Sequence, residues 1–116
     1  MNIVIIAQNR IFRESLKTVL NQIQDFDVVF DSDNFYKLEN PGNHQIQLIL
    51  IDFSMSKENC VNIITEAIRM WPSVRFLYLT DYKEEWTING IKASDIILKN
   101  SSKKEFENKI RKQEIN

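Results

Sequence analysis

The sequence has 116 residues, enough for one domain (residues 1–116) with its own core. Its 15 basic and 16 acidic side chains leave a net charge of −1, which argues against a nucleic-acid-binding surface on this domain. Cys60 is the only cysteine and His44 the only histidine, so an intrachain disulfide is excluded and a zinc site is disfavoured. The N-terminus lacks the basic start of a signal peptide and no apolar stretch is long enough to cross a membrane, so we expect a soluble protein of the reducing cytoplasm.

The chain begins with a predicted strand over residues 2–7, because Ile3-Val4-Ile5-Ile6 is continuous and β-branched. Asn9 can cap the helix that follows, with Arg13 and Lys17 mostly on its outer face. Its apolar residues recur at helical spacing: Phe12, Leu16, Val19, Leu20 and Ile23. The phenylalanines and valines of residues 26–30 predict a second strand, at an edge of the sheet.

Residues 31–39 form a weaker helical pattern, and turn residues end it before His44, which we expect to be exposed and without a role. The next stretch, Leu48-Ile49-Leu50-Ile51-Asp52, is four consecutive aliphatic residues that end on a carboxylate. Such a run is typical of a central parallel strand buried on both faces. Ser56 can cap the following helix. We expect its buried stripe to be Val61, Ile64, Ile68 and Trp71, with Pro72 ending it.

A fourth strand is predicted over residues 74–79, with Thr80 and Asp81 at its exit. Asp81 and Glu84 resemble a capping box for a short helix that ends at Gly90. A fifth strand over residues 94–98 is followed by Lys99. The last helix has a capping box of Ser102 and Glu105, and Phe106 and Ile110 anchor it.

Five strands that alternate with five helices predict a doubly wound α/β domain, with a parallel sheet in the order 2-1-3-4-5. In that order the carboxyl ends of the strands bring Gln8, Asp52, Thr80 and Lys99 to one edge of the sheet. Asp52 could simply cap a turn there, but an aspartyl nucleophile needs a cation and a hydrogen-bond donor beside it, and Lys99 and Thr80 supply both.

These residues resemble the receiver domains of bacterial response regulators, over essentially the whole chain. The most specific pieces are Leu50-Ile51-Asp52-Phe53-Ser54-Met55, Phe76-Leu77-Tyr78-Leu79-Thr80 and Ile97-Leu98-Lys99-Asn100-Ser101-Ser102. Ile11-Phe12-Arg13-Glu14-Ser15-Leu16 resembles the NarL-type subfamily. The resemblance implies a CheY-like, flavodoxin-like (βα)5 three-layer sandwich.

The resemblance also implies a function in two-component phosphorelay signalling, as a signalling domain rather than an enzyme. Asp52 would accept a phosphoryl group from a histidine kinase or a small phosphodonor, with Mg²⁺ neutralising charge, while Thr80 bonds the group and Lys99 pairs with it. NarL-type receivers usually precede a LuxR-type helix-turn-helix, so regulation of transcription would reach DNA only through an output domain outside residues 1–116.

The sequence departs from the family pattern at the metal site, where the two acidic positions that hold Mg²⁺ are Ala7 and Gln8. Mg²⁺ requires oxygen ligands and relies on carboxylates, so we expect no resident cofactor and weak Mg²⁺ binding at most. Asp52 and Lys99 can then neutralise each other directly. Asp81 stands where the family keeps a small residue; it would oppose an incoming phosphate, or else serve as a substitute metal ligand.

Three hypotheses follow. The first is a receiver with impaired Mg²⁺-dependent phosphorylation that works through protein–protein contacts, and the second is an ordinary Asp52 phosphoacceptor. The third is a small flavodoxin-like enzyme or nucleotide binder, which the presence of two glycines and no Gly-rich loop argues against.

Candidate partners are a histidine kinase or other signalling protein and a second copy of the chain. The segment with Trp86, Ile88 and Ile91 is the candidate interface, since a short helix can bury only part of this apolar set. The alternative is that Trp86 packs inward as core.

Overall fold

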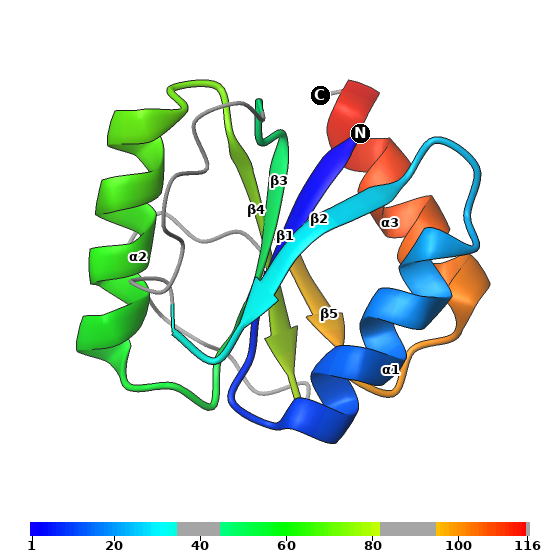
Figure 1. Cartoon of the computed structure of the whole chain (residues 1–116), viewed down its shortest axis with the longest axis horizontal. Helices are drawn as coiled ribbons and strands as arrows, with labels where there is room; N and C mark the ends of the chain where they lie inside the picture. Colours follow the sequence, from blue (N-terminus) through cyan, green and yellow to red (C-terminus); the bar gives the residue numbers. More distant parts are fainter. Residues whose placement is uncertain (35–44, 82–94, 116) are drawn as a thin grey trace.

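The computed structural model describes residues 1–34, 45–81 and 95–115. Its centre is a parallel five-stranded sheet in the order β2-β1-β3-β4-β5, which confirms the predicted topology. The helix α2 covers one face of the sheet, and α1 and α3 cover the other (Figure 1). In chain order the elements are β1 (Asn2–Ile6), α1 (Arg10–Asn21), β2 (Asp27–Ser32), β3 (Leu48–Asp52), α2 (Lys57–Met70), β4 (Arg75–Thr80), β5 (Ile96–Leu98) and α3 (Lys103–Ile115). None of the described helices has the length and apolar character to span a lipid bilayer.

The central strands are buried because they have helices on both sides. Along β1 and β3, successive side chains enter opposite cores: Ile5 and Leu50 pack on the side of α1 and α3, whereas Ile6 and Ile51 pack on the side of α2. All four are fully buried. This two-sided burial is the physical reason for uninterrupted aliphatic runs in the sequence.

The second predicted helix was placed partly wrong. Asp31 and Ser32, predicted to begin it, instead complete β2, where they pair with Ile5 and Ile6 of β1. In the sheet, the backbones of these two residues are stabilised by pairing with β1, whereas a short isolated helix is only marginally stable. Asp33 and Asn34, which follow β2, are not helical either. Residues 35–39 of this prediction, the short helix over 82–90 and His44 lie outside the described residues.

The buried stripe of α2 also differs from the prediction. Val61 and Ile68 are 44% and 46% exposed, and the helix instead buries Cys60, Ile63 and Ala67. The other two predicted residues do face the core: Ile64 is partly buried, and Trp71, directly after the helix, is buried. The predicted and observed stripes have the same spacing on neighbouring faces, so periodicity alone could not separate them. Cys60 and Ala67 are small and fully buried, and they present little bulk between α2 and the sheet.

The caps predicted at Asn9, Ser56 and Ser102 are confirmed, whereas the box of Asp81 and Glu84 extends outside the described residues. Asn9 accepts a hydrogen bond from the backbone N–H of Phe12 (2.9 Å), and Ser56 caps α2 in the same way (3.2 Å). At α3, Ser102 Oγ accepts from the N–H of Glu105 (3.1 Å) while the Glu105 carboxylate accepts from the N–H of Ser102 (3.0 Å). These caps fix where each helix starts after its strand, and so they fix the loops that surround the strand ends.

Candidate functional site

The predicted site residues lie at the carboxyl edge of the sheet, on three adjacent strands. Asp52 ends β3, Thr80 ends β4 and Lys99 directly follows β5. Backbone hydrogen bonds continue the sheet past these ends: Phe53 N–H donates to Leu79 O, and Lys99 N–H donates to Thr80 O, both at 2.8 Å. The three predicted site positions are therefore fixed relative to one another by the sheet itself.

The centre of the site is an ion pair between Asp52 and Lys99. Lys99 Nζ lies 2.7 Å from Asp52 Oδ1, and the two side chains are 16% and 1% exposed. The same oxygen accepts a hydrogen bond from the backbone N–H of Ser54 (2.8 Å). The predicted direct neutralisation is thus present, and the protein itself offsets the charge of this buried carboxylate.

Asp81 contributes a second carboxylate to the same ammonium. Its Oδ2 lies 3.3 Å from Lys99 Nζ, and its side chain is 57% exposed. The ring of Phe12 faces the ammonium from α1, with its centroid 5.6 Å from Nζ. Sequence reasoning treated Asp81 as a barrier to phosphate or a metal ligand and missed this pairing, although its position one residue beyond Thr80 placed it at the same edge.

Thr80 is 5% exposed at the end of β4, so its hydroxyl belongs to the buried part of this edge. On the opposite side of β3, the end of β1 carries no carboxylate: Ala7 is fully buried and Gln8 is exposed. Within residues 1–34, 45–81 and 95–115, no three His, Cys, Asp or Glu side chains are grouped so that they could hold a metal ion.

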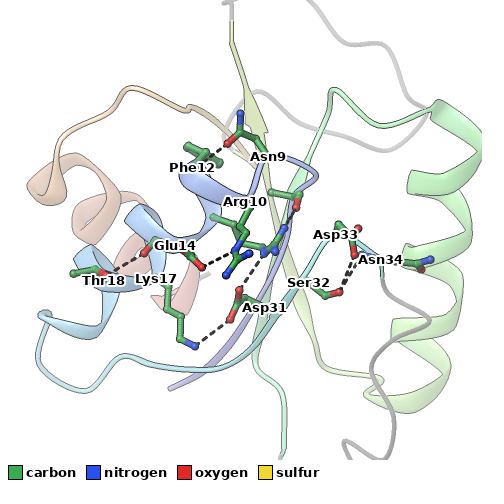
Figure 2. A network of polar contacts seen from close by, with 12 residues as sticks. Asn9, Arg10, Phe12, Glu14, Lys17, Thr18, Asp31, Ser32, Asp33 and Asn34 are labelled. Carbon is green, nitrogen blue, oxygen red and sulfur yellow. Dashed lines mark hydrogen bonds and ion pairs between the residues drawn. The ribbon is translucent and has the colours of Figure 1, made fainter.

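A basic side chain reaches the end of β1 instead. Arg13 Nη1 donates to the backbone oxygen of Ala7 (2.7 Å), and its Nε lies 3.0 Å from Asp31 Oδ2. Lys17 Nζ binds the other oxygen of Asp31 at 3.1 Å (Figure 2). Arg13 is only 14% exposed, so its predicted outer-face position was wrong. The reason is the misplacement of Asp31, which β2 holds opposite α1.

Neutral groups lie on the α2 side of the site. Cys60 Sγ is 4.0 Å from the backbone oxygen of Asp52, and burial together with the Asp52 charge raises the pKa of the thiol to about 11. Burial, with smaller effects from Asp95 and Cys60, raises the pKa of Tyr78 to about 12. Both groups stay protonated at neutral pH, so they add no charge beside Asp52.

The candidate interface residues Trp86, Ile88 and Ile91 lie outside the described residues.

Comparisons with known proteins agree with this fold. No protein-family model matches the chain. The transcriptional regulatory protein DegU of Brevibacillus brevis is 33% identical over 86 residues, a match that covers 73% of this chain and 36% of DegU. The chain therefore matches only about a third of the length of this relative.

Two solved structures illustrate the structural likeness. The signal receiver domain of the putative response regulator NarL from Mycobacterium tuberculosis superposes with a TM-score of 0.71 at 21% identity, covering 96% of this chain and 93% of that domain. CheY6 from R. sphaeroides, solved in complex with the P1 domain of CheA3, gives 0.77 at 16% identity, covering 99% and 97%. The predicted resemblance to NarL-type receiver domains is confirmed.

Proposed function

We propose that the chain works in two-component signalling through protein–protein contacts, with impaired Mg²⁺-dependent phosphorylation at Asp52. Its similarity to DegU and to the NarL receiver domain supports the signalling part of the proposal. The observation that carries the proposal is the 2.7 Å ion pair between Asp52 and Lys99, beside a β1 end that offers Ala7 and Gln8 instead of carboxylates.

The missing carboxylates affect the metal first. Mg²⁺ gives up its water reluctantly and is held by near-ideal octahedral oxygen ligands, with carboxylates among them. Asp52 is the one carboxylate on β3 at this edge, and its Oδ1 already contacts an ammonium and a backbone N–H. A metal ion there would meet the like charge of Lys99 with no acidic pair to offset it.

Phosphoryl transfer would also leave the pocket with too few cations. A phosphoryl group on Asp52 brings a charge of about −2 in place of one carboxylate charge. Among the described residues, Lys99 is the cation that contacts Asp52, and it would have to offset the added charge while still facing Asp81. Arg13 is already paired with Asp31 and the Ala7 carbonyl at the end of β1, so we do not expect it to offset the phosphoryl charge.

The test is incubation with acetyl phosphate and Mg²⁺, followed by intact-mass measurement. We expect the parent protein to remain mostly unmodified. Asp52→Asn, which keeps the shape and removes the acceptor, is the matched control. A near-stoichiometric gain of one phosphoryl group in the parent, lost in Asp52→Asn, would establish the alternative of an ordinary phosphoacceptor.

The proposed contact surface is the segment with Trp86, Ile88 and Ile91. Its partner would be a histidine kinase, another signalling protein or a second copy of the chain. Sedimentation of the parent and of Trp86→Ala, with circular dichroism to check the fold, tests this surface. A parent that is monomeric at every accessible concentration, with a variant that only unfolds, would place Trp86 in the core. Regulation of transcription would require an output domain beyond these residues.

A further inference from the structure

Lys99 is shared between two carboxylates of unequal exposure. Asp52, at 2.7 Å, is 1% exposed, while Asp81, at 3.3 Å, is 57% exposed. Lys99 itself is 16% exposed, so only a small part of it is open to solvent. One ammonium against two carboxylates leaves this group of three with a formal charge of −1 (+1 − 2).

We propose that Asp81 acts as an internal ligand that occupies the Lys99 ammonium and excludes phosphate-like anions from it. Asp81 would thereby determine which ligands the pocket accepts. This deepens the proposed function, because it names a second barrier to phosphodonors that is independent of the missing Mg²⁺ ligands.

The geometry favours a fixed ligand over a chance surface contact. The backbone N–H of Lys99 donates to Thr80 O (2.8 Å), and Asp81 is the residue directly after Thr80. The two partners therefore extend from backbone segments that are already hydrogen-bonded to each other. Phe12 faces the ammonium at 5.6 Å, so an apolar ring takes up another part of its surroundings.

The charge distribution favours exclusion. An anion that approaches Lys99 from solvent meets the more exposed carboxylate, Asp81, before the buried Asp52. Like charges repel, and they repel more strongly where solvent is partly excluded. Removal of Asp81 brings the formal charge of the group from −1 to zero, which we expect to tighten phosphate binding by about tenfold, the factor that 1.4 kcal/mol represents.

The experiment is a titration with inorganic phosphate in buffer without Mg²⁺, followed through the backbone amide signals of Ser54 and Lys99. We expect weak or no saturable binding in the parent and about tenfold tighter binding in Asp81→Asn. Addition of Lys99→Met to Asp81→Asn should abolish the gain. Asp81→Ser is a second variant of the same position.

The matched control is Asp27→Asn, which makes the same change in net charge on an exposed residue at the start of β2. It should bind phosphate as the parent does. Equal binding by parent and Asp81→Asn, no binding by either, or an equal gain in Asp27→Asn would each overturn the proposal. The titration contains no acetyl phosphate and no Mg²⁺, so the proposal for Asp81 and the proposed loss of phosphorylation can each fail independently.

Discussion

The strongest test of the pocket is the substitution Lys99→Met, which removes the ammonium and retains an unbranched side chain of similar length. In the parent, Lys99 Nζ is 2.7 Å from an Asp52 oxygen, and the Asp52 side chain is 1% exposed. The variant leaves that carboxylate buried with the Ser54 N–H as a remaining donor. We expect a substantial loss of folding stability, because a buried charge would be left without its counterion.

The size of the loss follows from the geometry. With an effective dielectric constant of about 20, unit charges 2.7 Å apart attract by about 6 kcal/mol. Desolvation of the two groups offsets much of this, and removal of one partner of a buried pair costs about 3–5 kcal/mol. The retained hydrogen bond from Ser54 places Lys99→Met at the low end, about 3 kcal/mol.

Urea denaturation of the parent, Lys99→Met, Asp52→Asn and the double variant measures this loss and the coupling energy between the two residues. The double variant should be more stable than Lys99→Met, because the buried charge is gone. Lys17→Met is the matched control: its ammonium binds Asp31 at 3.1 Å, but the Lys17 side chain is 43% exposed, so we expect a loss below about 1 kcal/mol. A loss in Lys99→Met no larger than in Lys17→Met, or no coupling to Asp52, would refute the reasoning.

Three further predictions concern the metal positions, the buried thiol and the last helix. Ala7→Asp with Gln8→Asp should create Mg²⁺ affinity measurable by calorimetry and lower stability in metal-free buffer, since two further carboxylates would then crowd Asp52. A variant as stable as the parent and indifferent to Mg²⁺ would contradict this prediction. The pKa of Cys60 is about 11 when folded against an ordinary 9.0, so its contribution to stability is complete below pH 9 and is lost as the pH rises toward 11. Cys60→Ala should therefore flatten the fall of the unfolding free energy over that range, and an unchanged slope would count against the raised pKa. Ser102→Ala should cost about 1 kcal/mol in urea denaturation through loss of the α3 cap, and a neutral result would mean that this capping box adds no stability.

The sheet could be predicted from the sequence because strands buried on both faces require uninterrupted apolar residues. The run from Leu48 to Ile51 has no polar interruption, and each of its residues is buried. Parallel strands end at a common edge, so the row of Asp52, Thr80 and Lys99 follows from the strand order alone. The ion pair of Asp52 with Lys99 could be predicted in the same way, since Ala7 and Gln8 offer no carboxylates that would compete for the ammonium.

The errors have a common cause, which is that they depend on side-chain directions between elements. The rotation of α2 that buries Cys60 and exposes Val61 is decided by packing against the sheet, and both faces have helical spacing. The contact of Arg13 with Asp31 depends on β2 continuing past Phe30. Neither the helix rotation nor the strand length is encoded in a local pattern.

The charge balance of the pocket also bears on how the domain could transmit a signal. A ligand shifts a conformational equilibrium only by its difference in affinity for the two states. Since Lys99 already binds Asp52 and Asp81, we expect a small phosphodonor to bind both conformational states weakly and to shift the equilibrium little. A protein partner can instead gain binding free energy by burying apolar surface. We therefore expect a binding partner to raise the midpoint of thermal unfolding increasingly as its concentration exceeds its dissociation constant, and acetyl phosphate with Mg²⁺ to leave the midpoint unchanged. A shift of the midpoint by acetyl phosphate that requires Asp52 would show that the pocket opens to small donors after all.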